Sequence, residues 1–258
     1  MSCSELCQPV LQAQSVLAIF RDQLDAARGY AEAWVELARA ADDPYELVIA
    51  LIALAGAYMV QEPDVGIASL DEAVRVGRDA GIASALSLGL PILAGMLPIE
   101  ESERAITLLD EAVEIGTVIG DRLGVSMVLE ARASISARRG EWPTTLRAAV
   151  ESAELKLEVG DLVNIVGSFV FAALAFAALG HPEPAALFMS RARVMTDRLN
   201  AYWAVEMMAA TDAELLAALG EERLATLRAR GAALEITDAV AYLRAEAEPV
   251  LASLRGSV

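Results

Sequence analysis

Hydrophobic and polar positions divide the chain into two alternating kinds of helical segment. One kind is apolar on nearly all sides, and the other has an apolar stripe opposite an acidic face. The apolar segments are expected at residues 45–60, 82–97, 122–139 and 162–179. The amphipathic segments are expected at residues 64–79, 101–119, 144–159 and 184–199. Because each apolar segment is followed by an amphipathic one, the pattern predicts a series of stacked helix pairs.

A fixed period supports this prediction. The pentapeptide Leu-Asp-Glu-Ala-Val occurs at residues 70–74 and again 39 residues later, at 109–113. Residues suited to ending a helix recur at intervals of 39, 39, 40 and 40, at Asp42, Gly81, Gly120, Gly160 and Asn200. Gly and Asn tolerate the left-handed backbone conformation that closes a helix, so the period has a physical cause. Such a period indicates an array of two-helix units, each too small to bury its own apolar face.

The residues before this array are expected to form one more helix pair. Within residues 1–41 the pattern predicts helices at 9–27 and 30–41, separated at Gly29. Trp34 is predicted to anchor this pair to the next one, because a large aromatic side chain buries much apolar area.

The residues after the array are expected to depart from the period. Residues 201–258 are predicted to form a C-terminal helical cap, in which Thr211 and Asp212 begin a helix. With residues 42–200 as four units, the chain is predicted to be an all-α superhelix, or solenoid. It would contain about four to five helix pairs and the cap.

The repeat resembles the tetratricopeptide repeat in a long form of about 40 residues. The resemblance rests on a small residue in each first helix, at Gly56, Gly95, Ala133 and Ala173. It also rests on paired positions in second helices, at Leu70 and Ala73, Leu109 and Ala112, and Met189 and Ala192. The third unit departs from the pattern, because Ser152 replaces Ala and Arg132 stands beside Ala133.

The tail carries a second resemblance, in the segments 219–225 (LGEERLA), 230–234 (RGAAL) and 237–241 (TDAVA). These segments resemble the end of the repeat region in bacterial regulators of the STAND ATPase class, of the LuxR-type and cyclase-linked kinds. The resemblance implies a sensor region that binds a protein, a peptide or a small effector on its concave face. If the chain is a fragment, its partners would include the ATPase and DNA-binding modules of the same regulator. A free-standing adaptor unrelated to transcription remains the alternative.

Charge and hydropathy exclude other classes of function. A net charge of −17 argues against direct binding to nucleic acid, whose phosphates would be repelled. Uncharged stretches at 47–61, 80–99 and 162–182 approach the length of a membrane span. They recur with the period, contain Gly and Pro, and have acidic flanks, so buried helices explain them better. Cys3 and Cys7 are expected to be reduced thiols, and with no secretory signal the chain is predicted to be cytoplasmic.

Catalytic chemistry finds little support in the sequence. There is no phosphate-binding GxxxxGK[ST] loop, and Lys156, the only lysine, lies within a predicted helix. His181 is the sole histidine and stands in a Gly-His-Pro turn, which favours an exposed turn residue over a general base. Two cysteines and one histidine do not make a zinc site. The chain is therefore predicted to be no enzyme and to need no cofactor or metal.

Two groups of residues are candidates for binding. Arg132, Arg138 and Arg139 lie on the only apolar segment with several charges, and could hold an anionic ligand or a peptide carboxylate. The alternative is that they pair with neighbouring acidic helices. The second group is aromatic and includes Phe169, Phe176, Tyr202 and Trp203. It could line a ligand groove or simply belong to the core.

Overall fold

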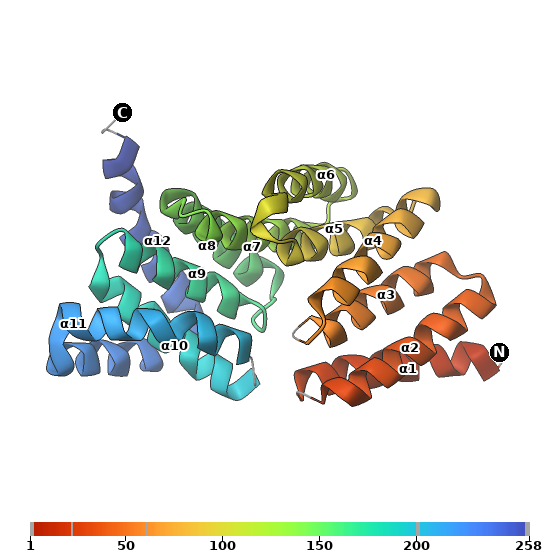
Figure 1. Cartoon of the computed structure of the whole chain (residues 1–258). Coiled ribbons are helices and arrows are strands. Elements are labelled where there is room, and N and C mark those ends of the chain that lie inside the picture. The colour runs from red at the N-terminus through yellow and green to blue at the C-terminus, as the bar shows by residue number, and fades with distance from the viewer. Residues whose placement is uncertain (1–2, 22, 60, 200–201, 256–258) are drawn as a thin grey trace. The chain divides into compact units, whose positions relative to one another are not determined.

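The computed structural model describes residues 3–21, 23–59, 61–199 and 202–255, with side chains for slightly fewer. The described residues form α-helices and one short 3₁₀ helix, without strands. The N-terminal pair is α1 (Cys3–Phe20) and α2 (Leu24–Ala41). First helices of the following pairs are α3 (Pro44–Tyr58), α5 (Ala83–Met96), α7 (Arg122–Arg138) and α9 (Ile165–Ala178). Second helices are α4 (Pro63–Asp79), α6 (Ser102–Ile119), α8 (Trp142–Val159) and α10 (Pro182–Leu199). The 3₁₀ helix (Ile99–Glu101) precedes α6, and α11 (Tyr202–Ala233) and α12 (Ile236–Arg255) end the chain (Figure 1).

Within each unit, most helices that follow one another in the chain pack as neighbours, which is compatible with a helical solenoid. The predicted helix ends have the expected backbone, with positive φ at Asp42 (52°), Gly81 (66°), Gly120 (71°) and Gly160 (79°). Asn200 lies outside the described residues. The helices form two compact units, Met1–Val125 and Ser126–Val258. No helix in the described ranges is both long and apolar enough to cross a membrane.

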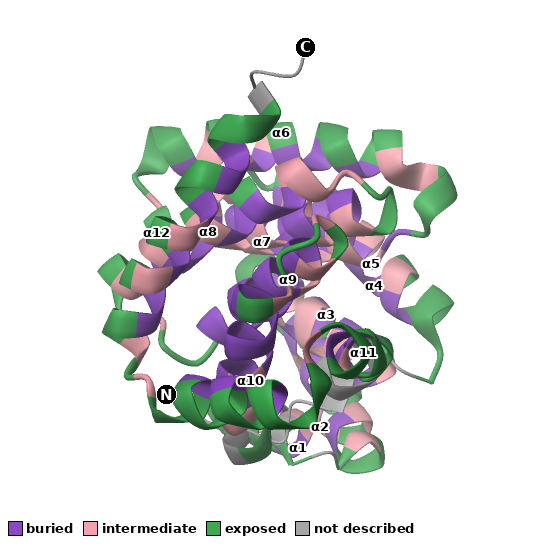
Figure 2. Ribbon diagram, turned by 90° about the vertical axis from the view of Figure 1, so that its left-hand side faces the viewer, coloured by how far each residue is buried: buried purple, intermediate pink, exposed green. Residues whose placement is uncertain are grey.

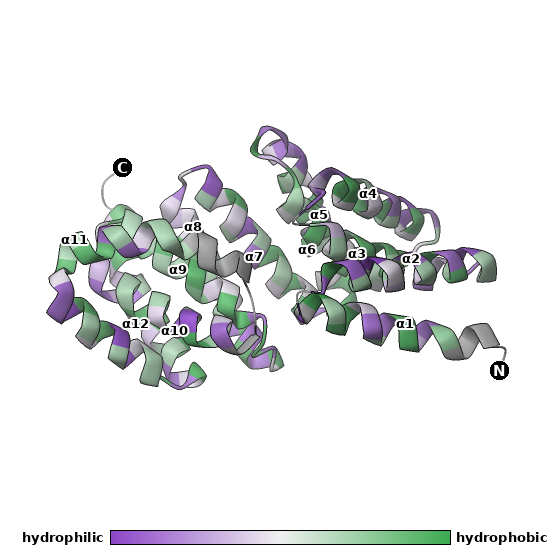
Figure 3. Ribbon diagram, turned by 60° about the horizontal axis from the view of Figure 1, so that its bottom comes forward, coloured by the Kyte–Doolittle hydropathy of each residue, from purple (hydrophilic) through white to green (hydrophobic). Residues whose placement is uncertain are grey.

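The prediction for the N-terminal pair was wrong at Gly29, which lies inside α2. The chain breaks earlier, after α1, where Gln23 N–H donates to Ala18 O at 2.9 Å. A glycine inside a helix costs only about 1 kcal/mol, too little to end one that packs well. Hydrophobic and hydrophilic residues alternate along α1 (Figure 3).

Trp34 is 1% exposed in the cluster that joins α2 to α3, which confirms its predicted place in the core.

Ion pairs link the second helices of the first unit. Arg39 of α2 donates to Glu72 of α4 at 2.8 Å, and Arg78 of α4 donates to Glu111 of α6 at 3.0 Å. Arg104 of α6 also pairs with Asp71 of α4. Asp71, Glu72 and Glu111 of the repeated pentapeptide thus connect one repeat to the next, while the Leu and Ala of each copy are buried.

The second unit continues the period that was expected to dissolve after Asn200. Gly220 interrupts α11 with φ 73° and ψ 164°, and it follows Gly140 (71°) and Gly180 (80°) at intervals of 40 residues. Asp212 and Arg228, eight residues on either side of Gly220, pair at 2.9 Å. The element α11 is therefore a helical hairpin, which makes a fifth pair after the N-terminal pair of α1 and α2. Thr211 and Asp212 lie within its first helix instead of capping one.

Helix α12 follows this fifth pair and returns to pack against α8 and, to a lesser extent, α10. Its apolar side is buried over most of its length, with Ala239, Leu243 and Ala247 at most 1% exposed. Figure 2 shows α10 mostly in the colour of buried residues. The second unit thus covers its second helices with its own last helix.

Candidate functional site

The three predicted arginines lie in or just after α7. Arg132 is half-buried, and Arg138 and Arg139 are exposed at the helix end. The Nε of Arg139 donates to Glu141 Oε1 at 2.7 Å, so this arginine pairs with an acidic neighbour. None of the three is free of interactions within the protein. Arg138 and Arg139 are nevertheless two consecutive exposed arginines at this end of α7.

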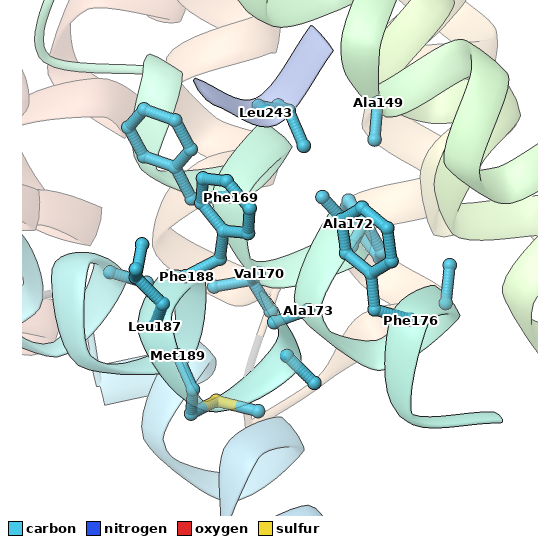
Figure 4. Close-up of a cluster of buried hydrophobic side chains, with 14 of the residues drawn as sticks. Ala149, Phe169, Val170, Ala172, Ala173, Phe176, Leu187, Phe188, Met189 and Leu243 are labelled. Atoms are coloured by element: carbon cyan, nitrogen blue, oxygen red, sulfur yellow. The ribbon is translucent and has the colours of Figure 1, made fainter. Parts of the chain in front are cut away.

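Of the two alternatives for the aromatic group, a ligand groove or the core, Phe169 and Phe176 take the core, because both are completely buried. Both rings stack on Phe188 of α10, with centroids 6.0 and 5.9 Å apart, and Phe188 in turn meets Tyr242 of α12 at 5.8 Å (Figure 4). They belong to the core because α10 and α12 cover this side of α9. Tyr202 and Trp203 lie in α11, but their side chains are outside those that the structure describes.

The tail residues that carried the family resemblance hold the end of the array together. Arg223 donates both Nε and Nη2 to the carboxylate of Glu183 in α10, at 2.9 and 2.8 Å. The guanidinium of Arg230 lies 4.9 Å from the centroid of the Tyr242 ring. At Gly231 a Cβ atom would collide with the carbonyl oxygen of Leu187. These contacts give the tail motif a structural role.

His181 lies in the turn between α9 and α10 and is exposed, as expected of a turn residue. Its backbone N–H donates to Phe176 O at 2.8 Å, and its ring meets the Phe176 ring edge-on. No three His, Cys, Asp or Glu side chains in the described part of the chain gather where they could hold a metal ion.

The strongest departure from the repeat is Lys156 in α8. The equivalent positions one and two repeats earlier are Gly116 and Gly77. A Cβ atom there would lie 3.1 Å from Val125 and 2.9 Å from Leu86, respectively, so the earlier interfaces leave little room for a side chain. Lys156 places a whole ammonium-bearing chain at this position and is only 1% exposed.

Three elements surround the buried ammonium. Its Nζ donates to the carbonyl oxygen of Asn164, in the turn before α9, at 2.8 Å. It also forms an ion pair with Glu130 of α7, whose side chain is 26% exposed. A Cβ atom on Gly167 of α9 would collide with the Glu130 carboxylate, so glycine is needed there for the carboxylate to fit.

Buried hydroxyl groups extend this polar site between the same three helices. Ser152, one turn before Lys156 in α8, donates to Ser126 O of α7 at 3.1 Å. Ser168 of α9 donates to the Ser152 hydroxyl, also at 3.1 Å. Buried polar groups of this kind are tolerated because they have partners. The departure of Ser152 from the expected alanine therefore belongs to the Lys156 site.

Burial lowers the pKa of Lys156 to about 8, and the negative charge of Asp161 opposes this shift. The neighbouring Glu130 carboxylate also favours the charged form of the amine. The group is therefore an ammonium at neutral pH and loses its proton at mildly alkaline pH. The site can hold or release one proton in the core of the second unit.

The turn next to Lys156 differs from its counterpart one repeat earlier. Helix α7 begins two residues after Gly120, and Asp121 caps it by accepting from Gly124 N–H at 2.9 Å. The chain after Gly160 starts in the same way, because Asp161 Oδ1 accepts from Asn164 N–H at 3.3 Å. Yet α9 begins only at Ile165, three residues later than the sequence predicted.

Sequence reasoning considered Lys156 only as a residue for phosphate binding and did not identify Glu130 or Asn164. The available signal was the place of the only lysine at a position where the two preceding repeats carry glycine. Comparison of the chain with protein-family models finds no match, and comparison with curated protein sequences finds none either.

Proposed function

We propose that this chain is a non-enzymatic interaction or sensing domain of the tetratricopeptide type. It binds a protein, a peptide or a small effector on the face formed by its first helices, which is the concave face in arrays of this kind. The tail resemblance favours the sensor region of a cytoplasmic bacterial transcriptional regulator. Binding would then shift an equilibrium between inactive and active states of the attached ATPase and DNA-binding modules.

The observation that carries the proposal is the distribution of charge over the first helices. Helices α3, α5 and α9 contain no Lys, Arg or His, whereas α7 and the residue after it carry Arg132, Arg138 and Arg139. Arginine is suited to binding carboxylates because its guanidinium donates two parallel hydrogen bonds. The expected ligand is therefore a carboxylate, from an acidic segment or a chain terminus, flanked by apolar groups.

The test uses the partners that the immobilised chain captures from a native lysate. Each partner is purified, and its Kd is measured by calorimetry against the wild type and Arg132→Glu/Arg139→Glu. We expect the Kd to rise at least about tenfold, because hydrogen bonds to charged groups contribute about 1.5–3 kcal/mol.

Arg147→Glu/Arg244→Glu is the matched control, because it makes the same change in charge on exposed residues of α8 and α12. Its Kd should stay close to that of the wild type. Equal affinities for all three proteins would show that the arginines of α7 do not bind the partner. An ATPase reading frame fused or adjacent to this one favours the regulator, and its absence favours the free-standing adaptor.

A further inference from the structure

We propose that Lys156, Glu130 and Asn164 form a latch that holds the first turn of α9 open, and that release of the latch lets α9 begin at Leu162. The inference concerns the second unit alone and does not depend on the proposed binding face.

The first argument is the likeness of the two turns. Asp121 N–H donates to Gly116 O at 2.8 Å, and Asp161 N–H donates to Lys156 O at 2.9 Å. The next residue repeats the likeness, because Arg122 N–H and Leu162 N–H donate to Gly120 O and Gly160 O at 3.1 and 3.0 Å. An N-terminal cap then follows in both turns. The local sequence therefore specifies a helix from residue 162, as it does from residue 122.

The second argument is the contact that only the later turn makes. At the end of residues 161–164 the Asn164 carbonyl accepts the hydrogen bond from the Lys156 ammonium. Glu130 fixes the position of that ammonium from the α7 side. The residue equivalent to Lys156 in the earlier repeat is Gly116, which has no side-chain donor. Helix α7 therefore begins directly after its turn.

The third argument is the energy balance that makes the latch reversible. A helix from Leu162 would give the amides of Ile165, Val166 and Gly167 the carbonyl acceptors of Asp161, Leu162 and Val163. The latched turn does not form these helical hydrogen bonds and instead provides partners for the buried charge of Lys156. This arrangement is favourable only while the Lys156 amine is charged. A buried charge without partners is more costly than a buried neutral amine, so the charged form needs the partners far more than the neutral form does.

The charged groups around Lys156 define what can switch it. Glu130 faces it from α7 and Asp161 lies in the turn itself. Helix α9 has no ionisable side chain. Helix α12, which packs on α8, brings Arg244 to Glu154, at 3.4 Å. Deprotonation of Lys156, whose pKa burial lowers to about 8, is therefore the direct way to release the latch.

The test is NMR of the full chain with Lys156→Met/Glu130→Gln, which removes the charges and keeps the volume. The ¹³Cα shifts of residues 162–164 should move to helical values. Exchange of the amides of residues 165–167 should slow about tenfold, as one added hydrogen bond per amide implies. Wild-type shifts should move in the same direction between pH 7 and 9.5, whereas those of the double variant should not.

Ser152→Ala serves as the control, because it alters the same interface one turn away and leaves the latch in place. Residues 162–164 of the Ser152→Ala variant should keep the wild-type ¹³Cα shifts. Glu130→Gln alone should move the shifts part of the way, and it carries the test if the double variant does not fold. Wild-type shifts at residues 162–164 in the variants that lack Glu130 would overturn the proposal. An equal pH response in the double variant would also overturn it.

Discussion

At the scale of single residues, Lys156 shows how one side chain alters a repeat. A charge buried between helices loses hydration, and the loss is acceptable only with well-placed partners. The ion pair with Glu130 and the hydrogen bond to Asn164 O supply them. Glu130 lies on α7 and Asn164 lies in the 161–164 turn, so the two contacts also fix these elements against α8.

Lys156→Met should destabilise the protein by about 2 kcal/mol, measured by urea unfolding at pH 7. Breaking a buried ion pair costs about 3–5 kcal/mol, and the value here is lower because Glu130 is 26% exposed and keeps some hydration. Lys156→Met/Glu130→Gln should recover most of this loss, since no charge is then left unpaired. If the two substitutions lower stability additively, the residues are not coupled and the ion pair has no energetic role.

At the scale of elements, two glycines inside α2 and α11 play opposite roles. At Gly29 of α2 a Cβ would have no atom within 4 Å, whereas at Gly231 a Cβ would collide with the backbone of α10. The close approach at Gly231 therefore sets how tightly the tail packs on α10.

Gly231→Ala should destabilise the protein by about 2 kcal/mol, because the two backbones must separate to admit a methyl group. Gly29→Ala should stabilise it by about 0.5–1 kcal/mol, because alanine favours the helix and nothing obstructs it. The measurement is the midpoint of thermal unfolding for each variant. A destabilising Gly29→Ala would contradict the position of Gly29 inside α2, and a neutral Gly231→Ala would contradict the close contact.

Most helices between residues 44 and 199 could be predicted from the sequence, because their apolar faces, proline starts and glycine ends agree with one period. The tail was harder. Thr211 and Asp212 have the local chemistry of a helix cap, yet both lie within the first helix of the α11 hairpin, where Asp212 pairs with Arg193 and Arg228. The interval from Gly180 to Gly220 was visible in the sequence and indicated the fifth pair.

The candidate site was less predictable than the fold. Arg132, Arg138 and Arg139 were identifiable because theirs is the only predicted first helix with several charges, and their binding role stays a prediction. Burial of Phe169 and Phe176 depends on α10 and α12, which local patterns do not place. The Lys156 site combines Glu130, Lys156 and Asn164 from separate elements. It becomes recognisable only when Lys156 is aligned with Gly116 and Gly77.

At the scale of the whole molecule, stability reflects two opposing effects of charge. The ion pairs of the first unit, such as Arg39–Glu72, are solvent-exposed and contribute about 0–1 kcal/mol each. The net charge of −17 produces repulsion over the entire chain. Since the 37 acidic residues outnumber the 20 basic ones by 17, we expect the repulsion to outweigh the pairs.

Raising NaCl from about 0.05 to 0.5 M at pH 7 should therefore increase the Tm by a few degrees, because screening shortens the reach of the repulsion to less than about 5 Å. Calorimetry measures this shift directly. The same increase in NaCl near pH 4.4, the isoelectric point of the sequence, should raise the Tm little or not at all, because the net charge is then close to zero. A Tm that falls with NaCl at pH 7 would mean that the exposed ion pairs, rather than the excess of carboxylates, dominate the electrostatic free energy of folding.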